Sequence, residues 1–270
     1  MSDRKTEILK SNLAWLQHDI RNTDVLYKAC LEKLADLAAD MTPGEAKGIY
    51  DSICETNVRG FALFCSLIVS KSKAHHEQVA DISSPRSVSY LRSHMTDKAF
   101  NIFSNNLGSL SAVYGPDFKS ICEDVYYERT DACILPLESS SDGLLMSFRQ
   151  LLLKYELNIF AVCDVIQNDD STLTLALLTA HPSNPGELCE VYFPSVPTGA
   201  LEDICAIIST LGGNIQRVSS ICSEYAFEAD HHICIGMQNT CLGALKFCFD
   251  ALYPSHMILG NYSNLNKGKE

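Results

Sequence analysis

Apolar positions recur along this chain with two different periods, and the change of period divides the chain into segments. Residues 6–40 and 43–73 carry apolar side chains at three- and four-residue steps, which predicts two helices joined by a tight turn. Thr42, Pro43 and Glu45 predict the start of the second helix, with Thr42 as N-cap and Glu45 completing a capping box. A two-helix hairpin cannot bury its apolar faces alone, so we expect it to pack on the next segment or on a second copy.

From residue 87 onward, short apolar runs of strand length alternate with helical stretches. The polar stretch 74–86 precedes them and is typical of a linker. We predict strands at 87–91, 110–114, 131–137, 158–165 and 172–179, and helices at 96–106, 117–129 (capped by Asp117) and 144–155. This alternation predicts one α/β lobe with a mostly parallel sheet covered by helices.

A second boundary, rich in proline and glycine, lies at residues 181–187. Beyond it we predict strands at 188–196, 215–221, 227–237 and 256–262, and helices at 200–211 and 240–252. The order strand–helix–strand–strand–helix–strand is the ferredoxin-like pattern. The sequence therefore predicts an α+β protein of three segments, residues 1–80, 81–182 and 183–263, with a disordered tail from Asn264.

The stretch from Asp131 to Gly143 joins the most apolar strand to a polar loop of three serines. We expect the strand to end at Leu137 and the loop to lead into a helix capped by Ser140 or Ser141, since helix N-termini in α/β proteins offer free N–H groups to ligands. A plain strand-to-helix turn would look the same in sequence.

Charge and composition exclude several classes of function. The 270 residues carry a formal net charge of −12, with scattered basic residues, which argues against nucleic-acid binding. The first ten residues have no apolar core of a signal peptide, and no window reaches the length of a membrane span, so we expect a cytoplasmic protein without membrane partners. Most of the twelve cysteines lie in apolar runs, which indicates buried free thiols. The paired histidines lack metal-ligand spacing, so the sequence predicts no metal and no cofactor.

The order of these parts resembles prephenate dehydratase, the enzyme that turns prephenate into phenylpyruvate. Pro136, Glu138, Ser140 and Gly143 match that family's motif after the helix that begins at Asp117, with Ser139 at the position of the family's asparagine. The resemblance implies a lobe of periplasmic-binding-protein type.

The flanking segments resemble the modules fused to that enzyme in bifunctional proteins. Gly199-Ala200-Leu201 and Leu259-Gly260-Asn261-Tyr262 are similar to motifs of the phenylalanine-binding ACT domain. The N-terminal helices are similar to chorismate mutase, through Leu16, Ile20 and Asp24 and through Ile53-Cys54-Glu55. The resemblance implies a role in phenylalanine biosynthesis and, because the mutase is a helical dimer, a homodimer.

Several family residues are replaced. The second dehydratase lobe is missing, and the returning motif is Thr172-Leu173-Thr174, without the arginine that would grip a substrate carboxylate. The mutase's arginine and glutamine are Gln17 and Phe61, and the ACT domain's ligand motif is replaced by residues 219–222. These losses favour a protein without dehydratase activity.

We therefore expect a regulatory protein that binds an aromatic amino acid or a prephenate-like carboxylate. The remnant catalytic candidates are Glu138, Ser140 and Thr172, and the candidate ligand-binding residues are Gly199, Ala200, Leu201, Asn214 and Ser219. The turn at 197–201 precedes a helix whose free N–H groups favour a carboxylate, and we expect the strand 215–221 beside it. An active dehydratase completed by a dimer, and a purely structural oligomer, are the alternatives. A cation beside Glu138 would distinguish them, and Arg92 and Arg149 are the candidates.

Overall fold

The computed structural model describes residues 24–54, 57–72, 84–167, 170–182, 186–222 and 227–266, and these form two compact units. One unit contains the described residues before 73 together with Cys241–Leu252. The other contains the described residues of 84–240 and 253–266. The division into three segments made from the sequence stays a prediction.

The regular elements of the described part of the first unit are all helices. Residues 24–38 are helical, and α2 (Pro43–Ile53), α3 (Val58–Lys71) and α8 (Leu242–Leu252) complete the unit. The predicted capping box of Thr42 and Glu45 is present. The helices approach closely at Gly60, where an added Cβ would lie 2.2 Å from the Tyr50 hydroxyl oxygen.

The prediction of one helix from Pro43 to about residue 73 is wrong. α2 ends at Ile53, and Asn57 caps a separate helix by accepting from the backbone N–H groups of Arg59 and Gly60. Asparagine side chains favour caps because they compete for backbone donors, and the apolar periodicity on both sides conceals such a break. α8 also packs against α2 and α3, so the apolar faces of these helices are covered by a helix from far along the chain. The predicted mutase positions before residue 24 lie outside the described residues.

The second unit begins with an α/β lobe, which we define as the described residues of 84–182. Its strands are β1 (Ser87–Tyr90), β2 (Ser111–Tyr114), β3 (Ala132–Ser139), β4 (Gly143–Leu144), β5 (Asn158–Ile166) and β6 (Thr172–Thr179). Its helices are α4 (His94–Leu107), α5 (Phe118–Tyr126) and α6 (Met146–Lys154). Asp117 caps α5 as predicted, through the N–H of Ser120.

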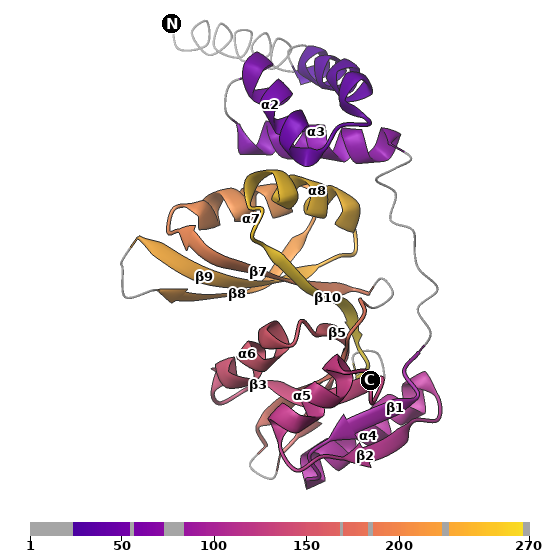
Figure 1. Ribbon diagram of the computed structural model, residues 1–270. Helices are drawn as coiled ribbons and strands as arrows, with labels where there is room; N and C mark the ends of the chain where they lie inside the picture. The colour runs from indigo at the N-terminus through magenta and orange to yellow at the C-terminus, as the bar shows by residue number, and fades with distance from the viewer. Residues whose placement is uncertain are drawn as a thin grey trace, which may run out of the picture. The chain divides into compact units, whose positions relative to one another are not determined.

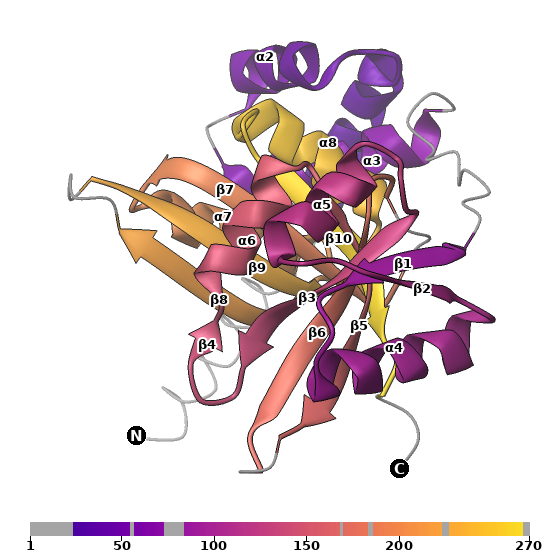
Figure 2. The same cartoon turned by 60° about the horizontal axis from the view of Figure 1, so that its bottom comes forward.

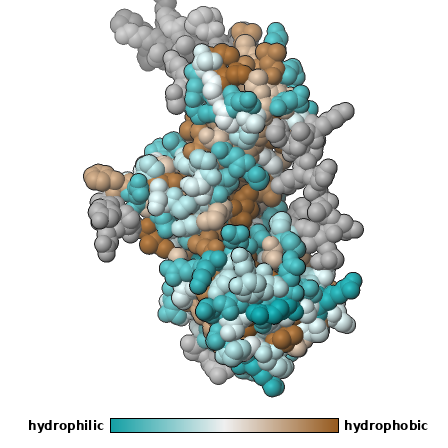
Figure 3. Space-filling view, viewed as in Figure 1, coloured by the Kyte–Doolittle hydropathy of each residue, from teal (hydrophilic) through white to brown (hydrophobic). Residues whose placement is uncertain are grey.

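Apolar residues on the two faces of this sheet form two separate cores. On one face, Cys133 and Leu135 of β3 pack with residues of α5 and α6. On the other, the alternate residues Ala132 and Ile134 pack with α4. β3 is therefore buried on both faces, as its continuous apolar run indicates. In Figure 3 the visible face of the lobe is mainly hydrophilic.

The sheet of the lobe is mixed rather than mostly parallel. β1 pairs in parallel with β2 and β3, but β6 pairs antiparallel with both β3 and β5. The connection between β5 and β6 spans five residues, which is too short for the crossover that a parallel pair needs, so the two strands pair antiparallel.

The remaining strands form what we call the ferredoxin-like sheet: β7 (Leu188–Pro197), β8 (Asn214–Cys222), β9 (Glu228–Gly236) and β10 (Met257–Asn264), with α7 (Ala200–Thr210) after β7. The strand order is β10-β7-β9-β8 and all three pairs are antiparallel, as the ferredoxin-like pattern predicts. α7 packs on β7 and β8.

β10 joins the ferredoxin-like sheet to the lobe. Its first part pairs with β7, and Ser263 and Asn264 then pair in parallel with β5 (Figures 1 and 2). Gly260 makes this passage possible, because an added Cβ would lie 2.5 Å from the carbonyl oxygen of Ile159. Tyr192, Leu259 and Tyr262 pack into the α5–α6 core, so this core is shared. The predicted disorder from Asn264 is wrong for residues 264–266. Asn264 donates a hydrogen bond to the carboxylate of Asp164, and Asn266 accepts one from the backbone N–H of Asp164.

The stretch from Asp131 to Gly143 differs from the prediction. β3 continues past Leu137 to Ser139, and Gly143 and Leu144 fold back as β4 to pair with it. α6 begins only at Met146, and neither Ser140 nor Ser141 caps it, because Leu145 occupies the N-cap position. Gly143, at φ 72°, allows the tight hairpin that replaces the expected strand-to-helix turn.

The described helices offer no candidate for a membrane span, since none combines sufficient length with sufficient apolar character. Of the eleven described cysteines, seven are buried, as expected from their apolar surroundings.

Candidate functional site

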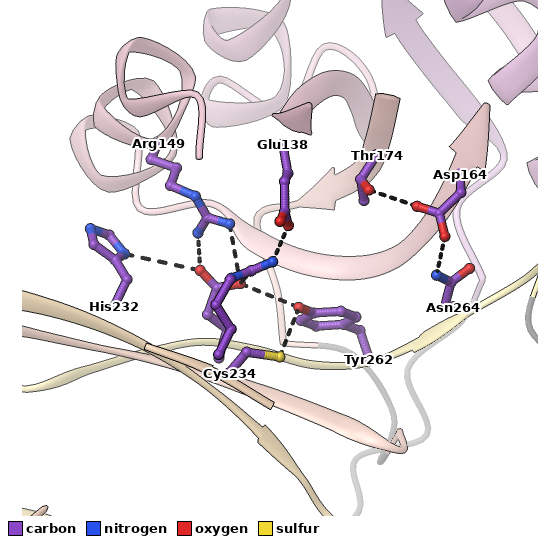
Figure 4. Close-up of polar contacts among 10 residues, drawn as sticks. Glu138, Arg149, Asp164, Thr174, His232, Cys234, Tyr262 and Asn264 are labelled. Atoms are coloured by element: carbon purple, nitrogen blue, oxygen red, sulfur yellow. Dashed lines mark hydrogen bonds and ion pairs between the residues drawn. The ribbon is translucent and has the colours of Figure 1, made fainter. Parts of the chain in front are cut away.

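A cavity of about 430 Å³ lies in the second unit, between the lobe and the ferredoxin-like sheet. We call it the charged pocket, because five acidic or basic side chains line it: Glu138, Arg149, Asp164, Glu190 and Arg217. The lobe contributes β3, α6, β5 and β6 to its wall, and β7, β8, β9 and β10 close the other side (Figure 4). Its apolar lining is Leu137, Val162 and Leu188, with the ring of Tyr262 beside them.

A buried ion pair forms the base of the pocket. Arg149 of α6 donates to Glu190 of β7 through both terminal nitrogens, and each side chain is 1% exposed. Burial and the nearby charge of Arg217 lower the pKa of Arg149 to about 10, so it stays protonated at neutral pH. A buried pair of this kind neutralises itself and leaves little charge for a ligand.

Arg217 is the second cation of the pocket, and it comes from β8. Its Nη1 donates to Glu138 of β3, and its Nη2 lies 3.6 Å from Glu190. The side chains of Arg217 and Glu138 are 31% and 28% exposed, so this pair faces the cavity. Guanidinium groups bind carboxylates with two parallel hydrogen bonds. Arg217 is therefore positioned to exchange Glu138 for a ligand carboxylate.

At the opposite side of the pocket, Asp164 of β5 is held by two neutral donors. The hydroxyl of Thr174 donates to Oδ1 at 2.6 Å, and Nδ2 of Asn264 donates to Oδ2 at 2.8 Å (Figure 4). Among the described residues, no cationic side chain forms an ion pair with Asp164. Its charge is thus oriented but not neutralised by these contacts.

Three further polar side chains surround Glu190. The Tyr262 hydroxyl donates to Glu190 Oε2 at 3.2 Å, and Cys234 Sγ lies 3.9 Å from that hydroxyl. His232 Nδ1 lies 4.0 Å from Glu190 Oε1, and its ring stacks on Tyr192. Burial, and then the charge of Arg149, lower the pKa of His232 to about 4, so the ring is neutral at pH 7.

The three remnant catalytic candidates lie together in this pocket. Glu138, Ser140 and Thr172 all line it. The N–H of Thr172 donates to Ser140 Oγ at 2.8 Å, and the N–H of Ser140 donates to the Thr172 carbonyl at 2.8 Å. These bonds tie the loop after β3 to the start of β6. The side chain of Leu173 packs against the α4 core and presents nothing to the pocket.

The candidate ligand-binding residues of the ferredoxin-like sheet are not brought together. β8 pairs with β9 and not with β7, so it is not the neighbour of the turn at Gly199. Asn214 pairs with Gly236, which also pairs with Leu188 at the start of β7, whereas Gly199 follows the end of β7. The ten residues of β7 separate the two ends by about 30 Å.

The remaining predicted residues stand alone. Ala200 and Leu201 open α7, and Gly199 at its N-cap has an ordinary helical φ of −73°. Ser219 of β8 pairs with His232 of β9. Asn214 lines a second cavity of about 290 Å³, which shares Leu188 and Gln216 with the lining of the charged pocket. Whether any of them binds a ligand stays a prediction.

Of the two cations considered from the sequence, Arg149 lines the pocket and Arg92 does not. Arg92 is 69% exposed and lies 3.7 Å from Asp97. Arg217 is the candidate site residue that sequence reasoning missed. It is the one charged residue of the predicted strand 215–221. A lone charged side chain among neutral strand residues is the sequence feature that could have identified it as a candidate.

No protein-family profile matches the chain, and no curated protein is significantly similar to it in sequence. Solved structures are similar in fold. Prephenate dehydratase from Streptococcus mutans superposes with a TM-score of 0.53 at 15% identity, over 66% of this chain and 99% of that one. Prephenate dehydratase from Arthrobacter aurescens, solved in complex with L-Phe, gives 0.52 at 14% identity, over 67% and 91%.

A third similar structure has a different description. It is GqqA, described as a novel type of quorum quenching acylase, with a TM-score of 0.53 at 20% identity, over 68% of this chain and 99% of that one. Together these likenesses show that the chain has a prephenate dehydratase-like fold. At such identities the likeness extends to the fold alone, and related folds carry different activities.

Proposed function

We propose that this chain is a non-catalytic binding protein of aromatic amino-acid biosynthesis, and that it takes a small carboxylate such as an aromatic amino acid in the charged pocket. The observation that carries the proposal is the Arg217 guanidinium, which reaches the lobe from β8 and stays about a third exposed. A pocket of about 430 Å³ with apolar walls and few converging charges is typical of small-molecule sites. The prephenate dehydratase-like fold supports the metabolic context.

The absence of catalysis is supported by what the candidate groups already do. Dehydration needs an acid that protonates the leaving hydroxyl and cations that hold the substrate carboxylates. Glu138 is engaged by Arg217, and Ser140 Oγ accepts from the backbone of Thr172. Leu173 stands where the resemblance calls for arginine, and it packs in the core.

An active prephenate dehydratase whose site is completed by a second copy is the alternative. The observation that favours it is the meeting of Glu138, Ser140 and Thr172 in one cavity. The turn at Gly199 remains a second candidate position for ligand binding, at an interface between two copies. Binding and turnover experiments distinguish these possibilities.

The test is a thermal-shift and calorimetric screen against phenylalanine, tyrosine, tryptophan, prephenate and chorismate. Because a ligand that binds the native state stabilises it, about 2.7 kcal/mol is expected at a concentration 100 times the dissociation constant. Arg217→Gln should abolish the shift, and Arg92→Gln, which changes an exposed arginine outside the pocket, should retain it. A shift that Arg217→Gln leaves intact would place the ligand elsewhere.

A further inference from the structure

The charges of the pocket specify more about its ligand than the presence of one arginine does. Three carboxylates line the cavity, from Glu138, Asp164 and Glu190, against the two guanidinium groups of Arg149 and Arg217. The pocket by itself therefore has an excess negative charge. An anion entering it gains from Arg217 but is repelled by the remaining carboxylates.

Only one of the two cations can be offered to a ligand. Arg149 and Glu190 are each 1% exposed and bound to one another, so turning Arg149 toward a ligand would leave a buried unpaired carboxylate. Arg217 is partly exposed, and its partner Glu138 is partly exposed as well. Glu138 can move toward water when a ligand replaces it, which makes exchange at Arg217 far less costly.

A ligand carboxylate that binds Arg217 displaces the carboxylate of Glu138 and brings a further negative charge into the pocket. Glu138 then loses its cation while still lining the cavity, and Asp164 has no cationic partner among the described residues. The two oxygens of Asp164 accept from Thr174 and Asn264, and each keeps a further lone pair. The pocket therefore favours a ligand that carries a positive group in addition to its carboxylate.

We propose that the charged pocket selects a zwitterionic α-amino acid, with its carboxylate on Arg217 and its ammonium group between Glu138 and Asp164. This inference rests on the proposed binding function and names the class of ligand. The three donors of an ammonium group suit two carboxylate acceptors, and Glu138 of β3 and Asp164 of β5 lie on either side of Thr174 in the sheet of the lobe. The side chain of the amino acid lies against Leu137, Val162 and Leu188, so it is apolar.

The same charges reject a dicarboxylate. Prephenate carries two carboxylates and no cation, and the second carboxylate would find no available guanidinium in the described part of the pocket. It would instead face Glu138 and Asp164, and like charges at close range in a partly buried site disfavour binding strongly. Discrimination against the dehydratase substrate thus follows from the pocket itself.

The test uses wild-type protein and ligands that differ by one charged group, measured by isothermal titration calorimetry at pH 7. L-phenylalanine is compared with 3-phenylpropionate, which lacks the ammonium group, with phenethylamine, which lacks the carboxylate, and with prephenate. We expect each of the three to bind at least about tenfold more weakly than the amino acid. Tight binding of 3-phenylpropionate or prephenate would overturn the inference while leaving the proposed binding function in place. No binding by any ligand would overturn both.

Variants then locate the ammonium group. Asp164→Asn preserves the shape of the side chain, and it should weaken L-phenylalanine about tenfold while changing the affinity for 3-phenylpropionate little or raising it. Arg217→Gln should weaken both. Asp97→Asn, at an exposed carboxylate outside the pocket, is the matched control and should change neither. Equal loss of both ligands in Asp164→Asn would contradict a direct contact with the ammonium group.

Discussion

Glu190 concentrates more interactions than any other charged group of the pocket. It accepts from Arg149 and from the Tyr262 hydroxyl, and its side chain is 1% exposed. We predict that Glu190→Gln lowers the free energy of unfolding by about 3–5 kcal/mol, because it leaves the Arg149 charge buried without a counter-charge. Urea denaturation measures this change.

A matched control distinguishes the effect of the unpaired Arg149 charge from the effect of the lost contact with Glu190. The double variant Arg149→Met, Glu190→Gln removes both charges and should recover much of the lost stability, since buried ion pairs are often replaceable by neutral groups. Arg92→Gln, at an exposed pair, should change the free energy of unfolding by less than about 0.5 kcal/mol. If the double variant lost as much stability as the two single variants together, a buried unpaired charge would not explain the loss in Glu190→Gln.

His232 should make the protein lose stability in mild acid. Its folded pKa of about 4 lies below the ordinary value of 6.5, so the unfolded chain takes up a proton that the folded protein excludes. The free energy of unfolding should therefore fall as the pH drops from about 6.5 towards 4, with a slope of about 1.4 kcal/mol per pH unit from this residue. Urea denaturation across this range should show a shallower dependence in His232→Phe than in the wild type, and parallel curves would count against the prediction.

Gly199 distinguishes the two candidate ligand positions. No atom lies within 4 Å of the position that a Cβ would take there, and its backbone is helical, so Gly199→Leu should fold normally. We expect the ligand-induced rise in melting temperature to persist in this variant and to vanish in Arg217→Gln. Loss of the rise in Gly199→Leu alone would favour the turn at 197–201 over the charged pocket.

At the scale of single elements, the end of β10 and the residues after it hold Asp164 of the pocket in place. Asn264 donates to Asp164 of β5, and Asn266 contacts the backbone of the same residue through both its amide atoms. We predict that Asn264→Ala costs about 1.5–3 kcal/mol, the range for a hydrogen bond to a charged group. Asn106→Ala, which removes an exposed side-chain contact on α4, should cost less than about 0.5 kcal/mol in the same denaturation assay.

The hairpin of β3 and β4 is the element in which local sequence signals were most misleading. Three serines before a helical stretch are typical of an N-cap, yet Ser139 Oγ and Ser141 Oγ bond one another at 2.8 Å within the hairpin. The loop also bonds across to Thr172. Partners from β6, distant in sequence, decided the conformation that the local pattern left open.

At the scale of the whole molecule, we predict that the purified protein turns over neither prephenate nor chorismate at an enzymatic rate. The charged pocket lacks a second available guanidinium among its described residues, and Phe61 is a buried core residue packed against Tyr50. Phenylpyruvate or prephenate forming well above a buffer control would contradict this expectation.

Homodimerisation stays a prediction, drawn from the resemblance to helical mutases. Exposed apolar residues in the first unit, including Leu26, Leu37 and Ile53, are consistent with it. Light scattering at micromolar concentration should give about twice the 29.8 kDa mass of one chain. The mass of a single chain would contradict the prediction.

The sequence by itself determined the type and approximate bounds of most elements, because apolar periodicity, caps such as Asp117 and the length of each run are local properties. It also indicated the ferredoxin-like order and placed Glu138, Ser140 and Thr172 as related residues. Only the tertiary structure decided that Arg217 meets Glu138, 79 residues away, and that α8 joins the N-terminal helices. Such partners depend on which strands pair and which faces pack together. Charges that meet through long-range packing leave no periodic signal in the chain.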